Sequence, residues 1–199
     1  MIIAVTPYEL LQRHHQQHLI LIEPYIDGVI LRTPTEADDL KIWVTTLINK
    51  GFPKSKIIIH SNVQCAEQLG IRRIHFREYE WPTAFRVEEW EVSMSVHSES
   101  AIEFAKAQGA KFGLYGHLFN TSSKHNQPPR TVSEVRQALN CHFPLVAIGG
   151  INDTTVAEIP PEFSGIAMIG SAFHQNLDEF RHIVQQWYEK GGEGSECRN

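Results

Sequence analysis

A histidine at the end of an apolar segment is the first feature of this sequence that suggests chemistry. Gly113-Leu-Tyr-Gly116 is suited to a buried strand, and His117 follows it directly before a polar loop. In α/β proteins the reactive groups lie at the carboxyl ends of strands. The same segment also fits a core histidine whose ring nitrogens bond to backbone groups, and by itself it favours that interpretation.

Two glycine-containing turns follow later apolar runs. One run ends with Gly149 and Gly150, and the next ends with Gly170 and Ser171. Glycine lets the backbone approach a ligand closely, and the N–H groups at a helix start favour an anion. Tight turns explain either segment alone. Two such turns in consecutive strand–helix units predict a phosphate site, because barrels commonly have a phosphate site in the loops after strands seven and eight.

Other polar residues also stand where strands are expected to end. Arg32 follows Gly28-Val-Ile-Leu31, and its guanidinium suits a ligand carboxylate or phosphate as well as it suits a structural ion pair. His60, His75 and His97 end three further predicted strands. Each of these histidines, taken singly, fits a structural role better than a catalytic one.

No metal or nucleotide motif is recognisable. His14 and His18 have the i,i+4 spacing that can bind zinc, but no third ligand accompanies them, so a solvated helix face is the better interpretation. The sequence contains no Walker loop, no G-x-S-x-G and no G-x-G-x-x-G. We therefore expect neither a metal nor an organic cofactor.

Composition narrows the class of protein. The 199 residues are 42% hydrophobic and 21% charged, with a net charge of -5, which argues against disorder and against a nucleic-acid partner. Three widely spaced cysteines, at positions 65, 141 and 197, do not suggest a disulfide framework. With no signal peptide and no apolar run long enough to span a bilayer, we expect a cytoplasmic protein without a membrane partner.

Short apolar runs alternate with amphipathic segments along the chain. Strands are predicted over 2–5, 28–31, 56–60, 73–76, 91–96, 112–116, 145–149 and 165–170. Helices are predicted over 8–19, 35–49, 63–69, 98–108, 131–139, 153–158 and 176–190, with Thr35 and Ser98 as caps and Gly51 and Gly109 as stops; 78–91 is expected to form at most a short, poor helix.

Eight strand–helix units favour a compact (β/α)8 TIM barrel, with a doubly wound open sheet as the alternative. We expect a single domain over residues 1–190 and a disordered, Gly-rich tail over 191–199.

With these residues in view, the sequence resembles the thiamine phosphate synthase/TenI family of small barrels, and most closely its TenI branch, the thiazole tautomerases. The resemblance covers nearly the whole chain. It is most specific in Ser95-Val-His-Ser98, Tyr115-Gly-His-Leu-Phe119 with Thr121, Ala147-Ile-Gly-Gly150 and Gly165-Ile-Ala-Met-Ile-Gly-Ser171.

The resemblance implies a barrel that binds a thiazole phosphate, with the phosphate on Gly149, Gly150, Gly170 and Ser171 and with Thr121 and Arg32 as further substrate contacts. The catalytic histidine of the tautomerases maps onto His117, where the synthases usually have proline. His97 is an accessory candidate. Small barrels of this kind can also pair as homodimers.

Two stretches depart from the synthase pattern. The synthases carry a lysine after strand two and an Asn-Asp pair after strand three, where this chain reads Leu31-Arg-Thr-Pro-Thr35 and His60-Ser-Asn-Val-Gln64. Magnesium pyrophosphate would lack a carboxylate ligand there. The loop 124–131 also lacks the Arg-Gly step of many relatives.

The expected activity is therefore a cofactor-independent isomerase that converts a carboxythiazole phosphate into its aromatic tautomer through proton transfer by His117. The alternatives are a thiamine phosphate synthase-like transferase, a non-catalytic regulatory thiazole-phosphate-binding protein, and a barrel isomerase for another small phosphate ester.

Overall fold

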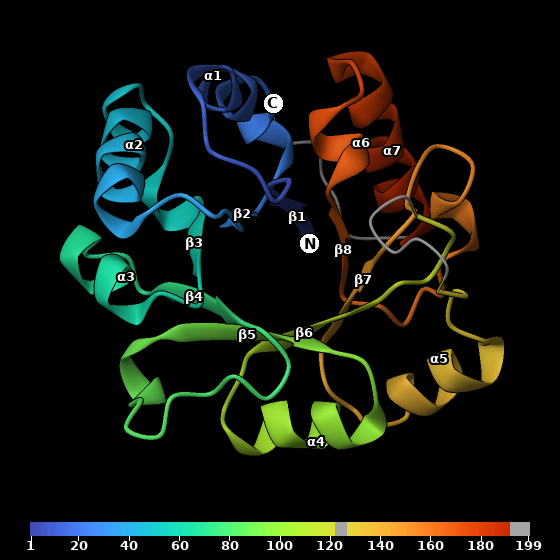
Figure 1. Cartoon of the computed structure of the whole chain (residues 1–199). Helices are drawn as coiled ribbons and strands as arrows, with labels where there is room; N and C mark the ends of the chain where they lie inside the picture. Colours follow the sequence, from blue (N-terminus) through green and yellow to red (C-terminus); the bar gives the residue numbers. More distant parts are fainter. Residues whose placement is uncertain (122–126, 192–199) are drawn as a thin grey trace.

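The chain folds into a closed barrel of eight parallel strands with helices around it (Figure 1). The computed structural model describes residues 1–121 and 127–191. Neighbours in sequence are neighbours in the barrel, and β1 pairs with β8 to close it. The strands are β1 Ile2–Val5, β2 Gly28–Leu31, β3 Ile57–His60, β4 Arg73–Phe76, β5 Glu91–Val96, β6 Phe112–Gly116, β7 Leu145–Ile148 and β8 Gly165–Met168. The predicted TIM barrel is confirmed.

Alternate strand residues fill the barrel interior, because side chains of a strand point to opposite faces in turn. A buried apolar cluster inside the barrel takes one residue or two from most strands, namely Ile3, Val5, Ile30, Ile58, Phe112, Leu114, Val146 and Ala167. The intervening strand residues form a second and larger core against the helices. The buried polar side chains His75 and Ser93 lie outside this apolar cluster and bond to each other.

The helices form the outer layer (Figure 1). They are α1 Arg13–Ile22, α2 Ala37–Asn49, α3 Val63–Leu69, α4 Glu99–Ala107, α5 Val132–Leu139, α6 Gly170–Phe173 and α7 Leu177–Lys190. Short 3₁₀ helices lie at Glu23–Tyr25, Lys54–Lys56, Val87–Glu89 and Val156–Glu158. The units after β4 and β7 thus have only a 3₁₀ turn among the described residues, and the helix predicted over 153–158 is a 3₁₀ turn from Val156.

The first two helices begin later than the sequence predicts. The prediction of 8–19 is wrong, since α1 runs from Arg13 to Ile22, and the hydroxyl of Thr35 does not cap α2. Instead, Thr35 accepts a hydrogen bond from the backbone N–H of Leu11 at 3.1 Å. Leu11 lies in the loop after β1 and Thr35 in the loop after β2. The hydrogen bond between the two loops uses groups that a local helix start would otherwise have used.

The predicted boundaries of α4 are confirmed. The hydroxyl of Ser98 accepts a hydrogen bond from the N–H of Ala101 at 3.2 Å, and Gly109, with φ of 85°, follows the helix end. Gly51, with φ of 98°, ends α2 in the same way. Such local signals are readable from sequence because both partners lie within one turn.

The disordered tail was predicted for 191–199, and residues 192–199 lie outside the described residues. Over the described segments, none of the helices combines the length and the apolar character that crossing a bilayer demands.

We predict that Gly165→Ala destabilises the barrel at its β1–β8 seam. A Cβ at Gly165 would lie 2.4 Å from the carbonyl oxygen of Met1, which is backbone and cannot move away cheaply. We expect a loss of about 1–3 kcal/mol in the free energy of unfolding, measured with denaturant. Gly170→Ala is the control, because a Cβ there meets nothing within 4 Å. Equal stability of the two variants would contradict this view of the seam.

Candidate active site

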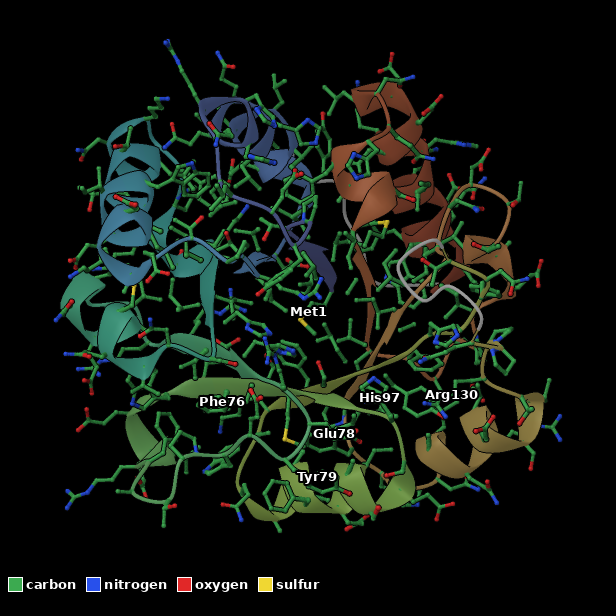
Figure 2. The ribbon with its side chains drawn as sticks, viewed as in Figure 1. Met1, Phe76, Glu78, Tyr79, His97 and Arg130 are labelled. Atoms are coloured by element: carbon green, nitrogen blue, oxygen red, sulfur yellow. The ribbon has the colours of Figure 1, made fainter. Side chains whose placement is uncertain are left out.

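The carboxyl ends of the eight strands meet at one rim, which we call the mouth of the barrel (Figure 2). Several loops leave the strands there in backbone conformations that favour glycine. Gly149 and Gly150 follow β7 with φ of 102° and 69°, whereas Ser61 after β3 and Tyr79 after β4 adopt φ of 57° and 60° despite having side chains. Strained backbone of this kind gathers at functional sites.

His75 lies inside the barrel and is held on both sides by serine hydroxyls. Its Nδ1 is 2.8 Å from Oγ of Ser93 and its Nε2 is 2.9 Å from Oγ of Ser95. Both serines belong to the neighbouring strand β5. Complete burial, and then the neighbouring His60, hold the pKa of His75 well below its ordinary value. His75 is therefore a neutral structural residue at pH 7, as predicted for it taken singly.

His60 pairs with His75 across β3 and β4, and their ring centroids are 5.7 Å apart. Burial lowers the pKa of His60 to about 4, and the positive charges of Arg77 and Arg32 act in the same direction, against a smaller opposing effect of Glu80. Neutral His60, Arg32 and Arg77 thus lie on this side of the mouth. Since Arg77 is paired with Glu80 at 3.4 Å, Arg32 is the group here that suits an anion.

Arg32 lies at the end of β2, with its guanidinium carbon 4.9 Å from the centroid of the Tyr8 ring. Burial lowers its pKa, as does the charge of Arg77, but a guanidinium starts from so high a value that it keeps its charge. Arg32 forms no ion pair with any described residue, and the nearby carboxylate of Glu80 binds Arg77 at 3.4 Å. This favours the ligand interpretation of Arg32 over the structural ion pair.

His117 is 7% exposed and follows β6 after a cis peptide bond. Its Nε2 lies 3.1 Å from the carbonyl oxygen of Gln127. A carbonyl can only accept, so Nε2 carries the proton and Nδ1 carries the lone pair. The bond to a backbone carbonyl is the one expected of a core histidine, but it also fixes the tautomer that a general base needs.

The loop after β6 is fastened to the loop after β7. Leu118 donates its backbone N–H to Ile148 and Phe119 donates to Gly149, at 3.0 and 3.1 Å. A Cβ at Gly149 would lie 2.3 Å from Cβ of His117, so only glycine fits beside this histidine. The predicted catalytic residue and the first predicted phosphate glycine are thus in contact.

The remaining predicted phosphate residues continue around the same rim. The hydroxyl of Ser171 donates to the carbonyl of Ile151 at 2.5 Å, which ties the start of α6 to the loop after β7. Gly170 faces open space. Thr121 is half-buried at the edge of the first described segment. The structure therefore brings His117, Gly149, Gly150, Gly170 and Ser171 to one side of the mouth, and Arg32 to another.

Arg130 was not identified from the sequence. Its Nε donates to the carbonyl of Gly116 at 3.4 Å, its backbone N–H donates to the carbonyl of His117 at 3.0 Å, and its guanidinium binds Glu134 at 3.1 Å. It therefore clamps the backbone on both sides of the Gly116–His117 bond and positions the histidine. The sequence predicts no role for the loop 124–131, whereas Arg130, in its described part, holds the backbone beside His117.

Glu78 was also missed. It accepts hydrogen bonds from the backbone N–H and from Nδ1 of His97, at 2.9 and 3.0 Å. Arg77, from the same loop after β4, had no place in the predicted site either. Glu78 is 19 positions from His97, and Arg77 is 17 positions from His60, so no local pattern marks them.

Glu9, His14 and His15 are the one group among the described residues whose ligand atoms could surround a metal, all within 4.8 Å of one another. Nδ1 of His15 accepts a hydrogen bond from the N–H of Gln12, and its Nε2 donates to Glu9 at 2.9 Å. A neutral imidazole used in this way has no lone pair left for a metal. The group is an ordinary helix-start hydrogen-bond cluster.

Sequence comparison connects the chain with thiamine biosynthesis proteins. The family model described as thiamine monophosphate synthase matches residues 3–172. A thiamine-phosphate synthase of Listeria monocytogenes is 33% identical over 164 residues, which cover 78% of this chain and 75% of that protein. The match to a thiamine-phosphate synthase of Nitrosospira multiformis, 30% identical over 110 residues, spans only 47% of that protein.

Solved structures share the barrel. A thiamine phosphate pyrophosphorylase from Pyrococcus furiosus superposes with a TM-score of 0.73 at 17% identity, covering 96% of this chain and 95% of that chain. A 3-hexulose-6-phosphate synthase from Salmonella typhimurium gives 0.70 at 14% identity, covering 96% of this chain and 100% of that chain. At such identities the likeness concerns the fold alone.

We predict that His60 makes the protein less stable in acid. An unfolded histidine takes up a proton near pH 6.5, whereas folded His60 does so only near pH 4, so the free energy of unfolding falls as pH drops between these values. His60→Gln should remove on the order of 1–3 kcal/mol of that fall. Denaturant unfolding at pH 7 and pH 4.5 measures it, with the exposed His182→Gln as control. Parallel behaviour of wild type and His60→Gln would contradict the prediction.

Proposed function

We propose a function for this chain from the premise that it belongs to the family described as thiamine monophosphate synthase. The proposed function is that of an enzyme of thiamine biosynthesis that acts on a thiazole phosphate. Within that class, we propose the tautomerase activity: conversion of a non-aromatic carboxythiazole phosphate into its aromatic tautomer. The observation that carries the finer proposal is the placement of His117, with a fixed tautomer, in contact with Gly149.

The substrate would lie across the mouth between two anion-binding sides. Its phosphate would bind the backbone of Gly149, Gly150, Gly170 and Ser171, because glycines there leave N–H groups accessible. Its carboxylate would bind Arg32, whose charge is flanked by Arg77 and neutral His60 rather than by a carboxylate of its own. The ring between the two anions would then be held near His117.

The proposed reaction needs proton transfer and nothing else. A proton leaves the ring carbon that bears the carboxylate, and a proton is added at the exocyclic carbon of the double bond. Nδ1 of His117 has the lone pair for the first step, since Nε2 donates to Gln127. General acid–base help of this kind contributes about 10²–10⁴-fold, and a held substrate supplies the rest.

Thiamine phosphate synthase activity is the second candidate, because the curated relatives carry that name. That reaction calls for magnesium pyrophosphate, and the residues after β2 and β3 do not fit it. Oδ1 of Asn62 accepts the N–H of Cys65 at 2.9 Å as a helix cap, and the two guanidinium groups beside His60 repel a cation. By name the relatives favour the synthase, whereas the residue types at the mouth favour the tautomerase.

We predict that His117→Gln lowers kcat for tautomerisation by about 10²–10⁴-fold while the aromatic product still binds within a few-fold of its wild-type Kd. Ultraviolet absorbance of the aromatic ring measures the first and calorimetry the second. His142→Asn is the matched control, because His142 is exposed, far from the mouth, and has φ of 49°, which asparagine tolerates. A folded His117→Gln protein with full activity would disprove the assignment.

We predict that Arg32→Ala raises KM by about 10–100-fold, since a charge-assisted hydrogen bond to the carboxylate is lost. Arg32→Lys should recover part of the loss, because it keeps the charge but not the planar fork. Steady-state kinetics on the same substrate measures both. Unchanged KM and kcat in Arg32→Ala would remove Arg32 from the substrate site.

The synthase is tested alongside by mixing a thiazole phosphate with a pyrimidine pyrophosphate and magnesium and measuring thiamine phosphate. Product formation at a rate comparable with tautomerisation would favour the second candidate. We expect tautomerisation alone.

A further inference from the structure

We propose that Glu78 and His97 form a second acid–base pair at the mouth, in which His97 delivers a proton to the substrate and Glu78 positions it. The proposal rests on the proposed tautomerase function and adds to it a second proton carrier. Nothing in the family match or in the residue spacing assigns Glu78 a role.

Glu78 binds His97 at two points. One carboxylate oxygen accepts the backbone N–H of His97 at 2.9 Å, and the other lies 3.0 Å from Nδ1 of its ring. A carboxylate at pH 7 can only accept, so Nδ1 carries a proton in either charge state of the ring. Nε2 is then the atom of His97 that can exchange a proton with a substrate.

The loop after β4 holds Glu78 in place. Tyr79, the next residue, adopts φ of 60°, which is costly for a residue with a side chain. Its hydroxyl is 3.1 Å from Oγ of Ser100, and its ring meets that of Phe104 edge-on, with centroids 5.2 Å apart. Both partners belong to α4, and Figure 2 shows Tyr79 toward that helix with Glu78 between it and His97. These two contacts hold the loop in place despite the unfavourable backbone conformation of Tyr79.

His97 lies next to His117 in the barrel order. Val96 pairs with Tyr115, so His97 and Gly116 leave adjacent strands at the same level, and His117 comes directly after Gly116. His97 directly follows the last residue of β5, at the carboxyl end of that strand. Its side chain is 34% exposed, which makes it open to a ligand. Figure 2 places it between Glu78 and Arg130, the residue that clamps the His117 backbone.

The proton transfers balance with two histidines. In the proposed cycle, His117 accepts a proton at Nδ1 and His97 gives one from Nε2. The C–H bond at the carboxylate-bearing carbon breaks, its proton goes to Nδ1 of His117, and its electron pair enters the ring. The exocyclic double bond shifts, and its outer carbon forms a new C–H bond with the proton from Nε2 of His97. One proton exchanged with solvent at each histidine restores the starting state.

A purely structural role of Glu78 makes a different prediction. If Glu78 only fastens the loop after β4 to the end of β5, its loss would lower activity equally at every pH. If it positions and charges His97, its loss would change how kcat depends on pH, because the reaction needs His97 protonated.

The test is the pH dependence of kcat for tautomerisation in wild type, Glu78→Gln and His97→Gln, each checked for folding by circular dichroism. We expect Glu78→Gln to lower kcat about tenfold with KM within about twofold, and His97→Gln to lower it about 100-fold. The alkaline limb of the wild-type profile should move to lower pH in Glu78→Gln, since the carboxylate charge is gone, and should vanish in His97→Gln.

Glu91→Gln is the matched control, because Glu91 binds Arg73 across the same two strands at the opposite end of the barrel. Its profile should keep the wild-type shape. Should Glu78→Gln not fold, His97→Gln tests the same limb.

Three outcomes overturn the pair. Wild-type kinetics in His97→Gln, or an unchanged alkaline limb in both variants, would refute it while leaving the tautomerase intact. A wild-type protein without tautomerase activity would refute the proposed function and the catalytic role of His97 together. In that case, 15N spectra of the histidine rings still show whether Glu78 fixes the Nδ1–H tautomer, which separates the geometric claim from the catalytic one.

Discussion

The pairing of β1 with β8 is the constraint on which the whole mouth depends. Each strand is only four to six residues long, and the seam is so close that a Cβ at Gly165 would meet the backbone of Met1. Closure in parallel order brings every carboxyl end to one rim, so residues that are far apart in sequence meet there. Part of the interior is an apolar cluster, and the buried polar side chain of His75 is satisfied by Ser93 and Ser95 of the neighbouring strand.

Two kinds of histidine result from this arrangement. His60 and His75 pair across β3 and β4, and burial lowers the pKa of each so that they stay neutral. His97 and His117 lie one strand pair further, where a carboxylate and a backbone carbonyl each fix one ring nitrogen and leave the other for proton exchange. In the proposed function, Arg32 beside the first pair binds the substrate carboxylate, and the second pair moves protons on a ring held between Arg32 and the glycine loops.

The sequence allowed most of the fold to be predicted, because its signals are local. Ser98 caps α4 through a residue three positions away, and the period of apolar residues marks each strand. The later start of α1 escaped prediction because Thr35 bonds to Leu11 from another unit. Likewise, the position of His117 at a strand end is a local feature. Glu78 and Arg77 act instead through contacts between neighbouring strand ends, and Arg130 acts through contacts with the start of its own long loop. The preference between tautomerase and synthase depends on residue types after β2 and β3, which comparison by overall identity does not weigh separately.

A crystal structure with the aromatic carboxythiazole phosphate bound tests the central claim most directly. We expect the phosphate on the backbone of Gly149, Gly150, Gly170 and Ser171, the carboxylate on Arg32, and the thiazole ring within hydrogen-bonding reach of Nδ1 of His117. A phosphate bound instead beside Arg32 and Arg77, with the ring out of reach of His117, would contradict it.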